Sequence, residues 1–520
     1  MGTLFVVWIG VLSAVWIVVT HAEPIVRARV IETLSARFKT KVELAELHVS
    51  AGHGLEVYGK GLKIFGPTDP NPTESGVQPL IAVEEFRFRT NVLGLLHSPM
   101  HLDAVSLRGM ILNIPPKEDR SQVAEMNRGR QGKIKIVVDH FVCQDAHLII
   151  NTLKPGKLPL DFAIGDLMMK DFGPGQPLRF QATLVNPKPV GNIASEGTFG
   201  PFREDQPGDT AVAGNYSFTE ADLGTLKGIG GILSSSGNYR GTLEKIEVDG
   251  ATDTPDFRVA TSGHPVALHT DFHAIVDGMD GDTYLQPVKA SFLHSVFTAN
   301  GKVVRVSTPP GRDIELDVVM THARIEDLLQ LGVKTDPPVL RGEIQMKTKL
   351  SIFPGREDIA HRLRLDGTFR IPEALFSNQK IQDRIDSLSL RSQGEPKLAV
   401  DHAEVGIPSE LGGSFKLSDG LFQFPALRFD VPGTQADVTG QYSLDGEIFD
   451  FHGRLRLKAK LSQTMTGWKS ILLKPVDPFF HKHGAGTEVP FKVTGTRSEP
   501  HFGLDFGDKR HLPSASASSR

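Results

Sequence analysis

The chain has 520 residues, which is too long for one ordinary compact core. It carries 52 glycines, typical of many turns and few long helices, and its formal net charge of −4 argues against a nucleic-acid-binding protein, which needs a basic excess. The 30 Phe residues far outnumber the 5 Tyr and 3 Trp, so most aromatic side chains lack a polar group and suit apolar surroundings.

An uncharged apolar run extends from Thr3 to Thr20. A helix needs roughly 20 such residues to cross a bilayer core, so we expect a transmembrane anchor over residues 1–22. The alternative is a cleaved signal peptide, because Thr20-His21-Ala22 resembles a cleavage site, although no basic residue precedes the run. The first basic residues follow the run, which favours a cytoplasmic body; large domains can be translocated despite such charges, and we expect the body outside the cytoplasm.

Short helices are expected at five places. The first, from Pro24 to Phe38, is amphipathic and would pack against the first strands or lie on the membrane surface. The others are Thr219 to Lys227, Thr321 to Leu331, Ser377 to Leu388 and Ser462 to Leu473. In the Ser377 segment the apolar residues Ile381, Ile385 and Leu388 recur at helical spacing.

From Val42 onward apolar and polar residues alternate, the pattern of strands with one apolar and one solvated face. The apolar positions of three clear segments are Leu363, Leu365, Phe369 and Ile371; Phe451, Leu455 and Leu457; and Phe502, Leu504 and Phe506. More than about twenty strands are expected, and open sheets rarely exceed about ten without curling or splitting. We therefore expect a mainly β body, either an elongated, curled antiparallel sheet that forms a groove or a set of β sandwiches.

Glycine-containing pairs separate many of these segments. The pairs expected to form hairpin turns are Asp249-Gly250, Asp277-Gly278, Asn300-Gly301, Asp419-Gly420 and Asp445-Gly446. Asp366-Gly367 lies inside a continuing alternation and predicts a bulge or a strand glycine instead.

No sequence motif for catalysis, nucleotide binding or metal binding is present. The chain has no P-loop, dinucleotide-binding glycine motif, HExxH or G-x-S-x-G string. The single cysteine, Cys143, is expected to be a buried packing residue and excludes thiolate zinc sites. On a strand His269, Asp271 and His273 would project from one face, a set able to hold a metal, but the opposite face is apolar and a solvated face explains them more simply. We expect no catalytic residue, no metal and no cofactor, and hence no enzyme.

The chain resembles the AsmA-like family of bacterial envelope proteins. The resemblance rests on the N-terminal run leading into residues 30–50, on residues 79–96 and 100–114, and on residues 420–457 and 489–506, which are similar to the family's C-terminal repeat. With it we expect an anchor at 1–22, an AsmA-like N-terminal helix and strands at 23–116, a middle β region at 133–320 and an AsmA-like C-terminal β region at 321–507. The composition predicts a polar loop at 117–132 and a disordered tail at 508–520.

The resemblance also implies a single-pass inner-membrane protein with a periplasmic body that supports outer-membrane integrity. Its partner would be phospholipid carried along an apolar groove, lined by the ten apolar positions given above, and other envelope proteins could also bind. Three functions remain open: lipid transport, a scaffold or regulator for outer-membrane protein assembly, and an envelope hydrolase with an unrecognised site. The same apolar faces could also close on one another as an ordinary core.

Overall fold

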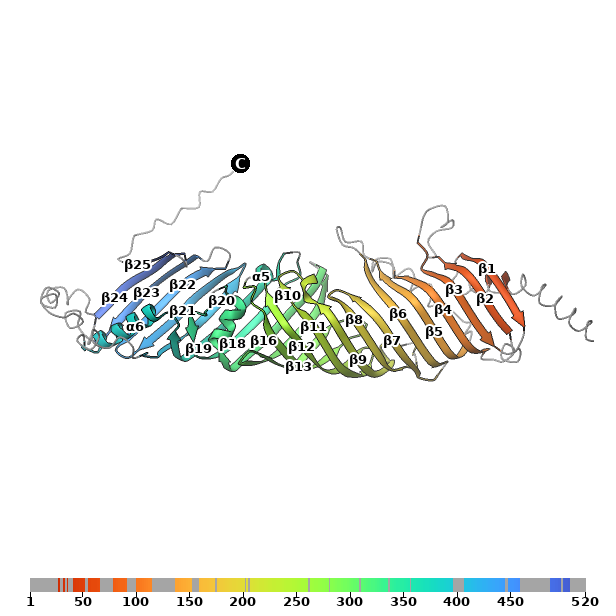
Figure 1. The fold of residues 1–520 in the computed structure, drawn as a ribbon, viewed down its shortest axis with the longest axis horizontal. Coiled ribbons are helices and arrows are strands. Elements are labelled where there is room, and N and C mark those ends of the chain that lie inside the picture. Colours follow the sequence, from red (N-terminus) through yellow and green to blue (C-terminus); the bar gives the residue numbers. More distant parts are fainter. Residues whose placement is uncertain are drawn as a thin grey trace, which may run out of the picture. The chain divides into compact units, whose positions relative to one another are not determined.

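The protein is described from a computed structural model (Figure 1). The structure describes residues 27–28, 31–32, 35, 41–51, 55–65, 78–90, 100–114, 136–151, 159–173, 175–201, 203, 206–260, 262–279, 281–307, 310–334, 337–355, 357–395, 406–444, 448–458, 487–496 and 499–505. The expected anchor at 1–22, the polar loop at 117–132, the helix from Ser462 to Leu473 and the tail at 508–520 lie outside these residues. Within the described ranges, no helix has the length and apolar character needed to span a membrane.

The expectation of a mainly β body is confirmed, since the part of the chain that the structure describes contains 25 strands in sheet pairing. The first twelve are β1 (Val42–Ala51), β2 (Leu55–Ile64), β3 (Ile81–Thr90), β4 (Met100–Ile114), β5 (Ile136–Ile150), β6 (Leu160–Phe172), β7 (Leu178–Pro187), β8 (Val190–Phe199), β9 (Ala211–Asp222), β10 (Ile229–Gly230), β11 (Ile232–Thr242) and β12 (Lys245–Val259). The next are β13 (Val266–Val276), β14 (Thr283–Phe292), β15 (Ser295–Ser307), β16 (Pro310–Arg324), β17 (Leu340–Arg341), β18 (Glu343–Ile352), β19 (Leu363–Phe376), β20 (Ser409–Ser418), β21 (Leu421–Val431), β22 (Thr434–Ser443), β23 (Ile448–Leu457), β24 (Thr487–Thr496) and β25 (Pro500–Leu504).

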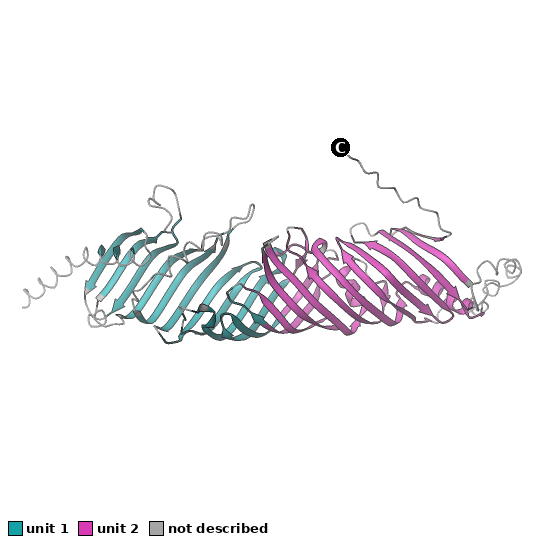
Figure 2. Cartoon of the chain, turned by 180° about the vertical axis from the view of Figure 1, so that it is seen from behind, with its two compact units in different colours: residues 1–225, 232–252, 275–279 teal, residues 226–231, 253–274, 280–520 magenta. Residues whose placement is uncertain are grey.

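The chain divides into two compact units (Figure 2). Unit 1 comprises residues 1–225, 232–252 and 275–279, and unit 2 comprises residues 226–231, 253–274 and 280–520. In unit 1, β1 to β9 pair in chain order and β9 then pairs with β11. In unit 2, β14, β15, β16, β18 and β19 to β25 form a second ladder of neighbours.

The expectation of a wholly antiparallel body is wrong at one position, because β4 and β5 pair in parallel. Their register runs from Met100 opposite Ile136 to Ile114 opposite Ile150. Parallel neighbours need a connection of a dozen or more residues, which returns the chain to the same end of the sheet. Residues 115–135 supply that length, and the alternation within either strand carries no sign of the direction of its neighbour.

The helices whose bounds lie within the described residues are short. They are η2 (Pro207–Asp209), η3 (Leu223–Thr225), α4 (Ile325–Gly332), α5 (Ile359–Arg362) and α6 (Gln379–Ser392). The expected helices at Thr321 to Leu331 and Ser377 to Leu388 are confirmed as α4 and α6, and the five described residues between 27 and 35 are helical. The helix expected from Thr219 to Lys227 is wrong: β9 continues to Asp222, whose Oδ1 accepts a hydrogen bond from Gly224 N at 2.8 Å and closes a local turn into η3.

The glycine pairs divide into turns and strand interiors. Asp277-Gly278 and Asp419-Gly420 lie between strands as predicted, and Gly367 is a strand glycine of β19. Asp249-Gly250 and Asn300-Gly301 lie inside β12 and β15, so the turns predicted there are wrong. At Gly301 an added Cβ would overlap the backbone of Glu315 on β16, so glycine permits close strand approach there. Asp445-Gly446 lies outside the described residues.

One strand arrangement occurs twice in the chain. β9 is followed by η3 and the two-residue β10, then by β11, which pairs with β9, and by β12, which pairs with β10. Likewise β16 is followed by α4 and the two-residue β17, then by β18, which pairs with β16, and by β19, which pairs with β17. In each case a glycine with positive φ separates the short strand from the long one: Gly231 at φ +126° and Gly342 at φ +146°.

Each unit has its own apolar cluster. In unit 1 the buried members lie on β1 to β3 and include Leu44, Leu47, Val57 and Phe86. In unit 2 they lie on β15, β16, β18 and β19, and are Ala299, Val318, Met320, Ala323, Ile344, Ile371 and Ala374. Cys143 on β5 is fully buried, as expected for a packing residue.

Candidate functional site

The candidate site is the apolar face of unit 2, which we call the inner face because it carries the buried cluster of that unit. Strand pairing aligns its apolar side chains in rows that cross the strands. One row contains Gly301, Leu316, Leu350, Leu365, Leu417, Phe422, Tyr442 and Phe449. A second contains Met320, Met346, Phe369, Gly413, Leu427, Val438, Gly453, Phe491 and Leu504, and a third contains Ile371, Leu411, Phe429, Ala436, Leu455 and Val489.

Phenylalanine rings are in contact along this face from β19 to β23. Their sequence is Phe369, Phe415, Phe422, Phe424, Phe451 and Phe449, with successive ring centroids 6.1, 6.2, 5.9, 5.8 and 6.4 Å apart. These separations are those of favourable aromatic pairs. The excess of Phe over Tyr and Trp in the composition thus has a structural counterpart in a continuous apolar aromatic row.

Glycines opposite several of these rings provide the space that the rings occupy. Gly440 lies opposite Phe451, and a Cβ at Gly440 would overlap that ring. Gly453 lies opposite Phe491, where a Cβ would stand 2.9 Å from the ring. A ring that covers a strand glycine is a recognised way of packing such positions, because it fills the space left by the missing side chain.

The predicted lining residues of the inner face differ in how exposed their side chains are. Ile371 and Leu457, two of the predicted lining residues, are only 1% and 7% exposed. A more exposed group is half-buried, comprising Leu363, Leu365, Phe369, Phe451 and Leu455, and Leu504 is 51% exposed. Phe502 lies on β25 opposite Val493, and Phe506 lies outside the described residues.

Helix α4 accounts for part of this difference. Its residues Ile325 and Leu328 pack against the buried cluster that contains Ile371. The side chain of Asp327, on the same helix, is 3% exposed and accepts hydrogen bonds from Ser295 Oγ at 2.8 Å and His294 N at 2.9 Å. The helix therefore covers one part of the inner face, and the rows beyond it keep partly accessible apolar surface.

Helix α6 is held to the sheet by polar side chains rather than by the apolar residues that recur at helical spacing along it. Gln382, Asp386, Ser389 and Ser392 are its buried residues. Ser389 Oγ donates to Pro432 O at 2.7 Å, and Asp386 accepts from Gly406 N and Ile407 N at 2.9 and 3.0 Å. The predicted apolar stripe is correspondingly open: Ile381 is 43% exposed, and Ile385 and Leu388 are half-buried.

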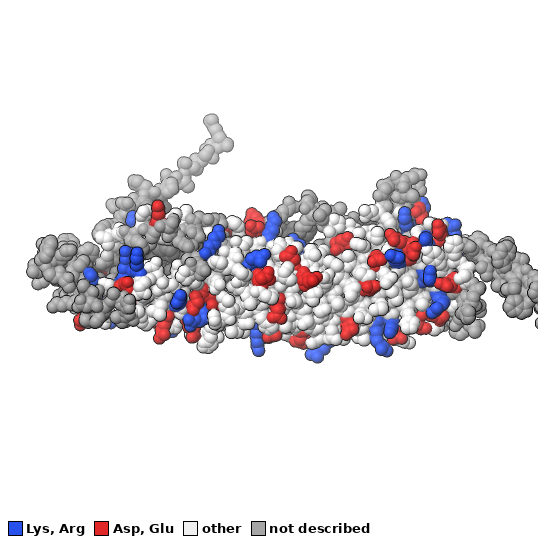
Figure 3. Space-filling model, in the orientation of Figure 1, with Lys and Arg blue, Asp and Glu red and all other residues white. Residues whose placement is uncertain are grey.

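The face opposite the inner face of unit 2 is charged. Cross-strand ion pairs join Lys416 Nζ to Asp366 Oδ2 at 3.1 Å, and Arg370 Nε to Glu410 Oε1 at 2.7 Å. The hydrogen bond from Arg370 lowers the pKa of Glu410 and raises that of Arg370. Figure 3 shows basic and acidic side chains interspersed on the side of the molecule that faces the viewer. Such exposed pairs add little stability, but they keep this face wetted and leave the inner face as the apolar one.

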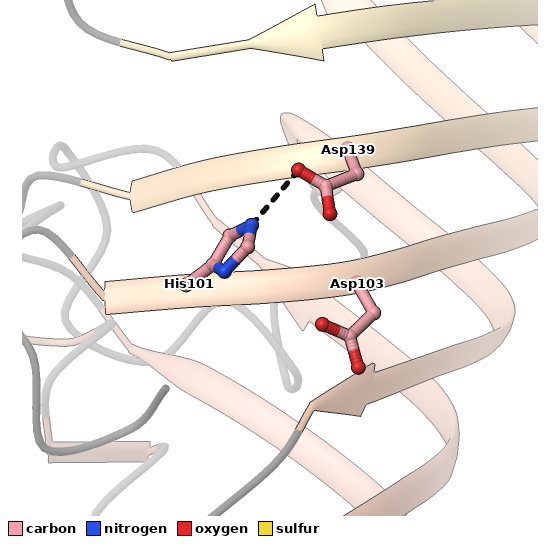
Figure 4. A group of neighbouring side chains, drawn as sticks. All are labelled: His101, Asp103 and Asp139. Atoms are coloured by element: carbon pink, nitrogen blue, oxygen red, sulfur yellow. Dashed lines mark hydrogen bonds and ion pairs between the residues drawn. The ribbon is translucent and has the colours of Figure 1, made fainter. Parts of the chain in front are cut away.

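In unit 1 a histidine and two aspartates meet on β4 and β5 (Figure 4). His101 Nε2 lies 2.8 Å from Asp139 Oδ1, and the ligand atoms of His101, Asp103 and Asp139 all fall within 4.8 Å of one another. The parallel pairing of β4 with β5 brings these residues together, so alternation within either strand could not have identified them. The hydrogen bond to Asp139 raises the pKa of His101, because the two carboxylates favour the imidazolium.

The histidines singled out in the sequence lie on β13, and among the described residues they do not form a group of possible metal ligands. His269 Nδ1 lies 2.6 Å from Asp253 Oδ1 on β12, and its Nε2 lies 3.5 Å from Asp271 Oδ2. The hydrogen bond with Asp253 raises the pKa of His269. His269 is therefore bound between two carboxylates.

A shallow hollow of about 250 Å³ lies over β6 to β9 in unit 1. Its rim includes Thr183, Val185, Asn192 and Ala194, which alternate with the inward positions of their strands. It falls just below the roughly 300–1,000 Å³ of typical small-molecule sites, and no ionisable group lines it. The hollow therefore offers less to a ligand than the inner face does.

Comparison with known proteins identifies no relative. No family model, curated protein or solved structure matches the chain.

Proposed function

We propose that this chain is a membrane-anchored periplasmic protein of the AsmA-like type that carries or guides phospholipid along the inner face of its β body. The observation that carries the proposal is the set of apolar rows in unit 2, which continue from strand to strand while Leu365, Phe369 and Leu455 stay half-buried. The anchor, the periplasmic location and the role in outer-membrane integrity rest on the sequence resemblance alone.

The chemistry of the inner face suits acyl chains. Burial of apolar surface contributes about 0.8 kcal/mol for each CH₂ group removed from water. Rows of Leu, Ile and Phe can bury any part of an acyl chain, and they contain no polar group that would hold the lipid at one position. A ligand that must slide is better served by such a surface than by a closed pocket.

The experiment compares opposite faces of one strand. Leu365→Asp puts a charge into the first apolar row, between Leu350 and Leu417. Thr368→Asp puts the same charge on the exposed face of the same strand and is the matched control. Each variant of the full chain is purified, bound lipid is quantified by mass spectrometry, and transfer of fluorescent phospholipid between donor and acceptor vesicles is measured.

We expect Leu365→Asp to lower bound lipid and transfer several-fold while the far-ultraviolet circular dichroism and the thermal transition stay close to those of Thr368→Asp. Wild-type lipid content no greater than that of an unrelated single-anchor membrane protein would contradict the proposal. Loss of folding in Leu365→Asp would assign that residue to an ordinary core. In that event Leu504→Asp, at the half-exposed end of the second row and set against the same control, tests whether the inner face is a lipid surface.

A further inference from the structure

The face of unit 1 that carries its buried apolar cluster, here called the inner face of unit 1, changes from apolar to hydroxyl-bearing between β7 and β11. One row across the strands contains Phe86, Leu107, Cys143, Leu167, Ala182, Ser195, Tyr216 and Gly237. It is apolar as far as β7 and then presents hydroxyl groups on β8 and β9. These strands are labelled near the middle of Figure 1.

Four hydroxyl groups meet at this position, and we call them the hydroxyl patch: Ser195, Tyr216, Ser235 and Tyr239. Ser195 Oγ lies 2.9 Å from the Tyr239 hydroxyl, and the Tyr216 hydroxyl lies 3.1 Å from Ser235 Oγ. The two tyrosines belong to a repeated Gly-Asn-Tyr sequence, and the pairing of β9 with β11 sets Tyr216 opposite Gly237 and Tyr239 opposite Gly214. All four side chains are half-buried.

The direction of each hydrogen bond follows from the backbone partners. Ser195 Oγ donates to Asn215 O at 2.9 Å, and Ser235 Oγ donates to Ala251 O at 3.0 Å. A hydroxyl has one proton, so each serine has used its donor, and each tyrosine must donate to its serine. The phenol oxygens of Tyr216 and Tyr239 keep lone pairs, so towards a ligand the patch acts as a hydrogen-bond acceptor.

The surroundings of the patch are uncharged. The neighbouring inner-face rows contain Leu184, Ile193 and Phe218 on one side, and Phe180, Gly197 and Gly214 followed by Phe199 and Val212 on the other. These positions offer no Lys or Arg to a phosphate. The patch is therefore a neutral acceptor site set in an apolar face.

We propose that the hydroxyl patch binds the headgroup of an amphiphile that carries hydrogen-bond donors, such as the ammonium of phosphatidylethanolamine or the hydroxyls of phosphatidylglycerol, while the acyl chains lie on the flanking apolar rows. The inference rests on the proposed lipid-carrying function and adds headgroup selectivity to it. Phosphatidylcholine has the same acyl chains and phosphate but a quaternary ammonium without a donor, so it is the ligand that the patch cannot recognise by hydrogen bonding.

The test is a competition among the three lipids. The full chain is incubated with vesicles that contain equal amounts of phosphatidylethanolamine, phosphatidylglycerol and phosphatidylcholine with identical acyl chains, then re-purified and extracted for mass spectrometry. A net hydrogen bond is worth about 2- to 12-fold in binding, so we expect the donor-bearing lipids to be enriched over phosphatidylcholine by roughly that factor. The double variant Tyr216→Phe/Tyr239→Phe keeps both rings over their glycines and removes both acceptors, and it should lose the enrichment while total bound lipid stays within twofold.

Tyr284→Phe is the matched control, because Tyr284 is 41% exposed on β14 in unit 2 and lies outside the patch. It should retain the wild-type enrichment. Equal binding of all three lipids to the wild type, an excess of phosphatidylcholine, or an enrichment that survives in the double variant would each overturn the headgroup site while leaving lipid carriage intact. Absence of any bound lipid would overturn both proposals. If the double variant fails to fold, the single variants Tyr216→Phe and Tyr239→Phe decide the question by the same ratio.

Discussion

Removal of the Asp386 carboxylate should release α6 from the sheet of unit 2. Asp386 is 1% exposed and accepts hydrogen bonds from Gly406 N at 2.9 Å, Ile407 N at 3.0 Å and Gln382 Nε2 at 2.8 Å. Asp386→Ala therefore leaves two backbone donors and one amide donor without this acceptor. The carboxylate is the only group that joins the helix to both Gly406 and Ile407 among the hydrogen bonds of the described residues.

The cost can be worked out from these three bonds. An orphaned buried donor costs about 1–3 kcal/mol, but Gln382 Nε2 keeps a second acceptor, Ile407 O, at 2.9 Å. Counting mainly the two backbone donors, we expect Asp386→Ala to destabilise the docked helix by about 2–6 kcal/mol. Asp383→Ala on the same helix is the control, because its bond to Gln379 Nε2 is solvent-exposed and its loss should cost less than about 0.5 kcal/mol.

Amide hydrogen exchange is the suitable assay, because a chain with two compact units need not unfold in one step and local opening is the quantity of interest. Exchange at Gly406 and Ile407 should accelerate by at least about 30-fold in Asp386→Ala, which corresponds to about 2 kcal/mol. The strands of unit 1 should exchange as in the wild type. Acceleration at Gly406 and Ile407 no greater than in Asp383→Ala would refute the view that a polar anchor, rather than the apolar stripe of α6, holds the helix in place.

Three further predictions concern single residues in other places. Gly440→Val should displace the ring of Phe451 and destabilise unit 2 by about 1–3 kcal/mol, seen as a lower denaturant midpoint, and an unchanged midpoint would contradict the packing of ring over glycine. The hydrogen bond with Asp139 raises the pKa of His101 above 6.5 in the folded state. The stability that His101 contributes should therefore be fully present below its pKa in the unfolded chain, and it should be lost as the pH rises through its pKa in the folded chain. Denaturant midpoints between pH 5.5 and 8.5 should therefore vary less in His101→Gln than in the wild type, and equal pH profiles would contradict this. Burial raises the pKa of Cys143 to about 11, so iodoacetamide at pH 8 should leave the folded chain unmodified and alkylate it in denaturant; rapid alkylation of the folded chain would show that the thiol is accessible.

The alternation of apolar and polar residues predicted most strands, because side chains of a strand point to opposite faces with a period of two. The same signal placed Leu365, Phe369 and Leu455 on one face, and strand pairing joins their positions into rows. Alternation does not encode which strands are neighbours or their direction. The alternation therefore could not predict the parallel pairing of β4 with β5, or the contact of His101 with Asp139 that this pairing creates.

Local turn and helix signals were less dependable, for physical reasons that can be named. The pair Asn300-Gly301 predicts a turn, yet Gly301 lies in a strand, where the backbone of β16 approaches too closely for any residue with a Cβ. On α6 the helical spacing of Ile381, Ile385 and Leu388 predicts the helix but not its buried face, where carboxylate, amide and hydroxyl groups bind backbone groups of neighbouring loops. A signal for the hydroxyl patch was present: the tripeptide Gly-Asn-Tyr occurs twice, ending at Tyr216 and Tyr239, and the two copies pair directly.

Exposure separates two roles that the sequence could not distinguish among the eight predicted lining residues whose burial the structure describes. Ile371 belongs to the buried cluster against which α4 packs and is 1% exposed, so a charge there removes core packing and should unfold unit 2 whatever the function of the protein. Leu365 shares its strand and its face but is half-buried, so a charge there changes the surface offered to a ligand at a smaller cost in stability. An ordinary closed core would make the two positions equally intolerant of charge. The difference between Ile371→Asp and Leu365→Asp in unfolding free energy, measured beside their lipid content, thus tests whether the inner face is an open apolar surface or the interior of a core.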